Sequence, residues 1–128
     1  MMIVVDASIV LDHLLGDLDA AVSTRIDGAD LAAPDLLDVE VASALRGLWL
    51  GHKVTEERVH TTIDDLARFE ADRFASSMLI PRAMQLRENL TVYDATYVAL
   101  AEVLECALLT RDRRIAAAPG IRCPVQVI

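Results

Sequence analysis

Short apolar runs alternate with longer helical segments along the whole of this 128-residue chain. The runs are brief and rich in Val, Ile and Leu, as expected for parallel strands that are buried on both faces. Five segments are predicted to be strands: Met2 to Val5, Leu31 to Ala33, Phe74 to Ala75, Ala107 to Thr110 and Val125 to Ile128. The alternation favours a single α/β domain over residues 1–128, with a mostly parallel sheet covered by helices on both faces.

The helical segments between these runs carry start and stop signals of their own. Glycine residues follow the first three helices, and Thr55 has the character of an N-cap. Pro81 is tolerable in a helix only near the first turn. The predicted helices are Ala7 to Leu15, Asp19 to Ile26, Leu36 to Leu50, Thr55 to about Phe69, Ser77 to Arg87, and Thr91 to Leu104.

The composition excludes several classes of protein. A hydrophobic content of 54% excludes disorder, and the aromatic content of 4% means that aliphatic side chains and alanine must fill the core. No run of about 18 uncharged apolar residues exists, so no membrane span is expected. The first residues lack the basic segment of a secretory signal, and we expect a cytoplasmic protein. Cys106 and Cys123 do not form a CxxC pair, so buried reduced thiols are expected.

The charge of the chain is strongly negative, at a formal net value of −8. This argues against a protein that holds nucleic acid by bulk electrostatic attraction. It does not exclude a nuclease, because acidic metal ligands contribute to the negative charge and bound cations would offset it locally.

Four acidic residues border or interrupt apolar segments: Asp6, Glu40, Asp94 and Asp112. Asp6 follows the first strand, and Asp112 follows the strand that ends at Thr110. In a parallel sheet, ligands bind beyond the carboxyl ends of the strands, so both residues are expected at that edge.

Three of these acids also have a simple local explanation. Asp6 and Asp112 can each cap a following helix, and Asp94 can form a variant capping box with Thr91. Glu40 resists such an explanation. It lies in or beside the apolar stripe of its helix, where a carboxylate needs a cation or an arginine partner.

A fold that gathers the four carboxylates would concentrate negative charge and would require a cation. Mg²⁺ and Mn²⁺ prefer oxygen ligands of this kind, and such sites suit phosphodiester hydrolysis. Arg111, Arg113 and Arg114 flank Asp112 and are candidates for contact with phosphate oxygens, or else are simply solvated.

Other chemistry has weaker support in the sequence. The three histidines, His13, His52 and His60, show no metal-binding spacing, and neither a P-loop nor a dinucleotide motif is present. Two alternatives stay open at this point. One is a catalytically silent interaction module whose acids are caps and salt bridges, and the other is a phosphate-signalling domain of the receiver type.

Four segments in this order and spacing resemble the PIN-domain ribonucleases, and more narrowly the VapC toxins of bacterial toxin–antitoxin pairs: VVDASIVL, APDLLDVEVASALR, LTVYDATYVALA and LLTRDRRIA. The resemblance covers essentially the whole chain. It implies a compact three-layer α/β/α sandwich and endonucleolytic cleavage of RNA that depends on Mg²⁺ or Mn²⁺. The RNA substrate would be a structured one such as tRNA or rRNA.

The resemblance also implies roles for individual residues. Asp6 and Asp94 would be the principal ion ligands, while Glu40 and Asp112 would act through water, a second ion or positioning. The small hydroxyl residues that accompany the first and fourth acids would be Ser8 and Thr110.

The partners implied by the resemblance are a second copy of the chain and a VapB-type antitoxin. The antitoxin tail would occupy the RNA groove and often inserts a basic residue into the acidic pocket. The segments Leu36–Leu50 and Thr55–Phe69 are candidates for antitoxin contact. Trp49 is either an exposed anchor there or a core residue.

Overall fold

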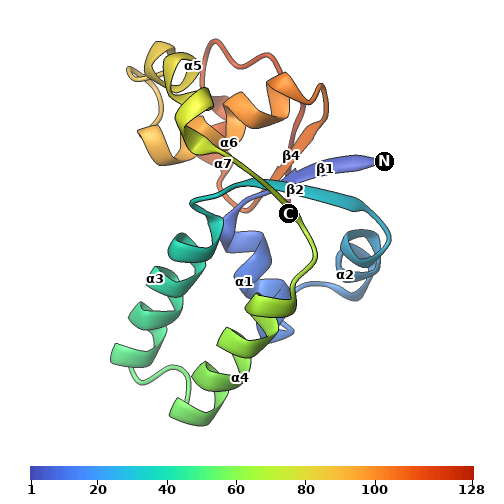
Figure 1. Ribbon diagram of the computed structural model, residues 1–128, viewed down its shortest axis with the longest axis vertical. Coiled ribbons are helices and arrows are strands. Elements are labelled where there is room, and N and C mark those ends of the chain that lie inside the picture. Colours follow the sequence, from blue (N-terminus) through green and yellow to red (C-terminus); the bar gives the residue numbers. More distant parts are fainter.

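A computed structural model describes all residues from 1 to 128 and contains one five-stranded sheet in the order β3-β2-β1-β4-β5 (Figure 1). Every neighbouring pair of strands is parallel. The central strand β1 therefore has β2 on one side and β4 on the other. The strands are β1 (Met2–Val5), β2 (Asp30–Pro34), β3 (Asp72–Phe74), β4 (Ala107–Thr110) and β5 (Val125–Val127).

Helices cover both faces of this sheet. In Figure 1, α1, α3 and α4 lie on one side of the strands, and α5 and α6 lie on the other. This arrangement confirms the predicted three-layer α/β/α sandwich. The helices are α1 (Ala7–Leu15), α2 (Ala20–Asp27), α3 (Leu37–Leu50), α4 (Glu56–Arg68), the 3₁₀ helix η1 (Ser76–Leu79), α5 (Ile80–Gln85), α6 (Val92–Val103) and α7 (Arg113–Ala117).

Local capping explains where most of these helices begin. The side chains of Asp6, Asp19, Thr55, Thr91 and Asp112 each accept a hydrogen bond from a backbone N–H in the first turn of the helix that follows. These bonds satisfy donors that a helix leaves unpaired at its N-terminus. The caps that the sequence predicts at Asp6, Thr91 and Asp112 are therefore present.

The core is a single cluster of 29 buried hydrophobic residues. Tyr97 is its only aromatic member, which confirms that aliphatic side chains and alanine fill the interior. Helix α6 contributes a continuous buried run from Ala95 to Ala101, because it packs against β1, β2 and β4. Because α6 packs against the central strands, its first turn is held at a fixed position relative to the carboxyl end of β1.

Two predicted elements differ from the structure by more than one residue at an end. The strand predicted at Phe74 to Ala75 covers Asp72 to Phe74 instead, because these residues pair with Ala32 to Pro34 of β2. The charge of Arg73 within the strand is paired with Asp38. The helix predicted from Ser77 is divided into η1 and α5, and it ends at Gln85. Pro81 accounts for the division, since it lies in the first turn of α5, where no backbone N–H is needed.

The two cysteine residues also differ from their prediction. Cys106 and Cys123 are free thiols, as expected, but they are half-buried rather than buried. Both line a cavity beside the ion pair between Arg82 and Glu102, at the edge of the sheet where β4 and β5 begin. No helix in the structure has both the length and the apolar character needed to cross a membrane.

Candidate active site

The strand order reverses between β1 and β4, and this point lies at the centre of the sheet. In open α/β sheets, ligands bind at such a switch point, beyond the carboxyl ends of the strands. Asp6 directly follows β1, and its backbone N–H donates to the carbonyl of Leu109 in β4 at 3.3 Å. The first candidate residue therefore lies at the place where the fold builds its ligand sites.

Asp6 is the most enclosed of the four acids, with 8% of its surface exposed. Its Oδ1 accepts hydrogen bonds from the Ser8 hydroxyl at 2.6 Å and from the backbone of Ile9 at 3.1 Å. Its Oδ2 accepts one from the hydroxyl of Thr110. Burial raises the pKa of the Asp6 carboxyl even against these three hydrogen bonds. Ser8 thus contacts the acid that it accompanies in the sequence. Thr110 accompanies Asp112 in the sequence and accepts a hydrogen bond from the backbone N–H of Asp112 at 3.0 Å, but it donates its own hydroxyl to Asp6.

Glu40 lies in the first turn of α3 and has no arginine partner. Instead, the hydroxyl of Tyr97 donates to Oε1 of Glu40 at 2.7 Å. Burial raises the pKa of the Glu40 carboxyl, the Tyr97 bond opposes that rise, and the negative charges of Asp94 and Asp6 add to it. The salt bridge that would have explained a carboxylate at this position is absent.

Tyr97 is a site residue that the sequence reasoning missed. It lies three residues after Asp94 on α6, so both side chains face the same side of the helix. This three-residue spacing is the sequence feature that could have identified Tyr97 as a polar group beside the acids. The burial of α6 among aliphatic residues, however, made Tyr97 indistinguishable from a core residue in the sequence.

Asp94 lies in the first turn of α6, where its backbone N–H donates to the Thr91 hydroxyl at 3.2 Å. Its carboxyl group is half-buried. Burial raises its pKa, the Thr91 hydroxyl opposes that rise, and the charges of Asp112 and Asp6 add to it. Asp94 therefore has two roles. Its backbone N–H is capped by Thr91, as the capping explanation predicts, and its carboxyl group belongs to the acidic site.

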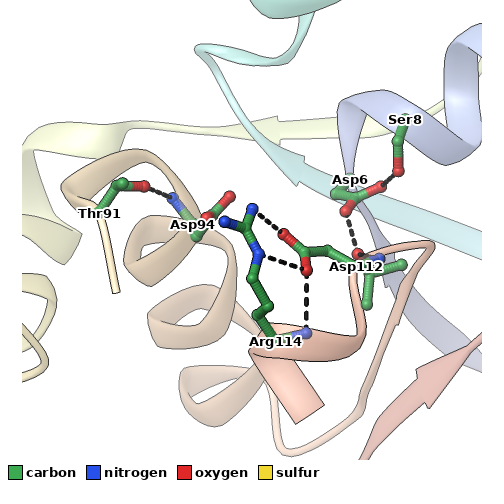
Figure 2. A network of polar contacts seen from close by, with 7 residues as sticks. Asp6, Ser8, Thr91, Asp94, Asp112 and Arg114 are labelled. Carbon is green, nitrogen blue, oxygen red and sulfur yellow. Dashed lines mark hydrogen bonds and ion pairs between the residues drawn. The ribbon is translucent and has the colours of Figure 1, made fainter. Parts of the chain in front are cut away.

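Asp112 differs from the other three acids because it has a cation of its own. Its Oδ1 accepts from the backbone N–H of Arg114 at 2.9 Å and from Nε of Arg114 at 3.1 Å, and Oδ2 accepts from Nη2 at 2.8 Å. These hydrogen bonds lower the pKa of the Asp112 carboxyl. Figure 2 shows the guanidinium of Arg114 on the side of Asp112 that faces Asp94.

The three arginines that flank Asp112 have different surroundings. Arg111 forms an ion pair with Asp12 of α1. Arg113 is exposed and has no ion pair, whereas Arg114 is held on Asp112. The three side chains therefore do not form a uniform basic patch.

A common feature explains how the four acids can gather in one place. Asp6 and Asp112 are the N-caps of α1 and α7, while Glu40 and Asp94 lie in the first turns of α3 and α6. The N-terminus of a helix carries a partial positive charge that favours a carboxylate nearby. Burial at Asp6, Glu40 and Asp94 nevertheless outweighs this stabilisation, and the charges of neighbouring acids add to the rise in pKa at Glu40 and Asp94.

The chemistry of this donor set fits a hard divalent cation. All four side chains offer carboxylate oxygens, and Asp6, Glu40 and Asp94 form no ion pair in the protein. The side chains do not yet surround one point, since no three His, Cys, Asp or Glu residues form a ready metal site. Binding of an ion would therefore require some carboxylates to reorient, and Asp112 could ligate it directly only after leaving Arg114.

Comparison with known proteins identifies relatives over nearly the whole chain. The family model of the PIN domain matches residues 3–121. Ribonuclease VapC1 of Mycobacterium tuberculosis (strain ATCC 25618 / H37Rv) is 42% identical over 128 residues, which cover 98% of this chain and 96% of that protein.

Solved structures show the same fold at lower sequence identity. The chain in the crystal structure of PAE2754 from Pyrobaculum aerophilum is 21% identical, with a TM-score of 0.69 over 98% of this chain and 92% of the other. A chain of a toxin–antitoxin complex from Klebsiella pneumoniae is also 21% identical, with a TM-score of 0.59 over 98% of each chain.

Proposed function

Because the chain belongs to the PIN-domain family, we propose that it is a divalent-metal-dependent endoribonuclease and the toxin of a type II toxin–antitoxin pair. The observation that carries this proposal is the set of acids at the switch point of the sheet. Burial raises the pKa of Asp6, Glu40 and Asp94, neighbouring acids add to the rise at Glu40 and Asp94, and none of the three forms an ion pair in the protein. A relative that is 42% identical and named as a ribonuclease supports the same activity.

In this proposal, each side chain acts from the position that the fold provides. Asp6 and Asp94 are the principal ligands of Mg²⁺ or Mn²⁺, and Glu40 and Asp112 act through water, a second ion or positioning. When bound, the ion supplies Lewis acidity toward the phosphodiester and a more acidic water molecule. Ser8 and Thr110 hold Asp6 in one orientation through hydrogen bonds to its two oxygens.

The substrate in this proposal is a structured RNA such as tRNA or rRNA in the cytoplasm. The net charge of −8 requires local positive groups near the site, since a bare acidic surface repels phosphate. Arg113 and Arg114 are exposed beside Asp112 and can contact phosphate oxygens. Arg111 is a weaker candidate, because its guanidinium is already paired with Asp12.

The partner in this proposal is a VapB-type antitoxin that packs on α3 and α4. These two helices enclose an apolar groove of about 370 Å³, lined mainly by Ala42, Leu45, Trp49, Leu50, Val59 and Ile63. Trp49 is 40% exposed there, which fits an interface anchor better than a core residue. The toxin–antitoxin complex from Klebsiella pneumoniae has a chain of the same fold.

A homodimer is also part of this proposal. Helices η1 and α5 expose apolar side chains on the face of the sheet opposite to α3 and α4: Met78, Ile80 and Met84. A second copy of the chain would cover this face and leave the antitoxin groove free.

The experiment that tests the proposed activity uses purified protein and a pool of total RNA. Cleavage is expected in Mg²⁺ and is expected to stop when EDTA is added. Asp6→Asn should lose cleavage, while Asp64→Asn, the same change at an exposed position on α4, should retain it. Cleavage that persists in EDTA, or at full rate in Asp6→Asn, would favour the catalytically silent interaction module with a contaminating nuclease.

A further inference from the structure

The guanidinium of Arg114 is the only cationic group that the structure places on the four acids. It binds both oxygens of Asp112, through Nε at 3.1 Å and Nη2 at 2.8 Å. Its positive charge also acts on the carboxyl of Asp94. Asp6, Glu40 and Asp94 have no ion pair of their own.

This ion pair is not needed for the fold of α7. The backbone N–H of residue 114 donates to Oδ1 of Asp112 at 2.9 Å and forms the cap of the helix by itself. The side chain of Arg114 is 87% exposed and extends over the surface to reach the same carboxylate. Exposed pairs of this kind are weak, so the guanidinium can leave Asp112 while the cap persists.

The contact also occupies one of the four carboxylates of the site. Asp112 is the one carboxylate of the four whose oxygens are both engaged by a cation of the protein. No three of the acidic side chains surround a common point in this arrangement. Release of Asp112 from Arg114 would return a fourth carboxylate to the group.

We propose that Arg114 is a built-in counterion of the acidic site, which competes with the divalent ion for Asp112 and, once displaced, binds a phosphate of the RNA. This inference rests on the metal-dependent activity proposed above. It assigns to Arg114 a role as a counterion of the site that neither Arg111 nor Arg113 shares.

Elementary electrostatics supports this exchange. A divalent ion among the carboxylates repels a guanidinium at the same position, so the two cations exclude each other. The planar fork of arginine matches a phosphate as well as it matches a carboxylate. A displaced Arg114 would therefore lie beside the ion with its fork free, where the RNA backbone has to pass.

The first test is a calorimetric titration of the antitoxin-free protein with Mn²⁺. Arg114→Gln is expected to bind Mn²⁺ about two- to fivefold more tightly than the wild type, because a competing surface ion pair is removed. Arg113→Gln is the matched control, since it removes an equal charge from the same helix without breaking an ion pair. Its affinity should change less than that of Arg114→Gln. Equal Mn²⁺ affinity in the wild type and Arg114→Gln would overturn the inference.

The second test measures RNA cleavage at saturating Mg²⁺ over a series of salt concentrations. Arg114→Gln should raise KM for RNA and reduce its salt dependence by about one phosphate contact, with a smaller effect on kcat. Arg114→Lys keeps the charge but loses the fork, so its KM should lie between those of the two proteins. An unchanged KM in Arg114→Gln would contradict the phosphate contact.

The two proposals fail in different ways. If the wild-type protein binds no Mn²⁺ at all, the metal-dependent function fails, and the inference fails with it. If the wild type binds Mn²⁺ but Arg114→Gln binds it equally well, only the role of Arg114 is wrong.

Discussion

The hydroxyl of Tyr97 donates a 2.7 Å hydrogen bond to Oε1 of Glu40 and so joins the core helix α6 to the first turn of α3. The two residues are 57 positions apart in the sequence. Tyr97 is only 2% exposed, so its hydroxyl depends on this carboxylate as a partner rather than on solvent. The bond therefore fixes the orientation of Glu40 relative to Asp94, which precedes Tyr97 by one helical turn.

Removal of this hydroxyl should impair the activity more than the fold. Tyr97→Phe is expected to lower kcat/KM for RNA cleavage by about 10- to 100-fold, as loss of a group that orients a metal ligand commonly does. The free energy of unfolding should change by only about 1 kcal/mol, because the ring remains packed. Single-turnover kinetics and urea denaturation would measure the two effects.

The control for this substitution is Tyr93→Phe on the same helix. Tyr93 is 63% exposed and forms no hydrogen bond with any of the four acids, although it lines the same surface pocket as Glu40. The Tyr93→Phe variant should cleave RNA like the wild type. Equal activity in Tyr97→Phe and the wild type would show that the hydrogen bond to Glu40 has no part in the reaction.

Stability of the metal-free protein should rise as the solution is made moderately acidic. The pKa values of Asp6, Glu40 and Asp94 are raised in the folded protein, above ordinary values of 3.8 to 4.5, so the folded state binds protons more readily than the unfolded chain. The stabilisation from these groups is complete when the pH is below their ordinary pKa values. It is lost as the pH rises through their pKa values in the folded protein. Asp112 has the opposite effect on stability, because Arg114 lowers its pKa in the folded protein. That effect is lost only as the pH falls below the ordinary pKa of 3.8.

Urea denaturation in EDTA between pH 7 and pH 5 would measure this dependence. Asp6→Asn should show a smaller rise in stability on acidification, since it removes the most enclosed of the three titrating groups. Asp64→Asn should follow the wild type. A metal-free protein whose stability falls steadily from pH 7 to pH 5 would contradict the raised pKa values.

The two thiols should react slowly at neutral pH. Burial and the charge of Glu102 raise the pKa of Cys123 to about 11, and burial raises the pKa of Cys106 as well. Since the thiolate is the reactive form, alkylation by iodoacetamide should be slow at pH 7 and should accelerate as the pH approaches 11. Mass spectrometry would follow the reaction, with the urea-unfolded chain as a reference. Native and unfolded thiols that react at the same rate at pH 7 would argue against this prediction.

Antitoxin binding should depend on the groove between α3 and α4. Trp49→Ala is expected to weaken binding of the antitoxin by tenfold or more, because exposed aromatic anchors commonly dominate an interface. RNA cleavage by the free toxin should not change, as Trp49 lies at the far end of α3 from Glu40. Met78→Ala, on the opposite face, is the control. Loss of antitoxin binding in Met78→Ala instead of Trp49→Ala would transfer the interface to η1 and α5.

Much of the fold and of the candidate site could be predicted because it depends on local features of the sequence, such as apolar runs, helix caps and terminating glycines. Asp6 and Asp112 follow apolar runs and cap the next helix, so their place at the carboxyl edge of the sheet was readable from the sequence. Gly16 ends α1 in the left-handed conformation that glycine adopts at no steric cost. Glu40 was recognisable because an acid beside a buried stripe needs a partner.

The partners themselves could not be predicted, mainly because they depend on tertiary contacts. The bond from Tyr97 to Glu40 requires α6 and α3 to meet at the same edge of the sheet. The pairing of Arg114 with Asp112 is local, but the sequence does not show whether an exposed arginine binds the carboxylate or stays in solvent. The early start of β3 depends on its pairing with β2, a strand about 40 residues earlier in the chain.

The most direct test of the account is calorimetric Mn²⁺ binding by the wild type, Asp94→Asn and Asp64→Asn. If the carboxylates at the switch point hold a divalent ion, the wild type and Asp64→Asn should bind Mn²⁺ alike, and Asp94→Asn should bind it at least about tenfold more weakly. Undiminished Mn²⁺ binding by Asp94→Asn, or no binding by the wild type, would contradict the proposed site.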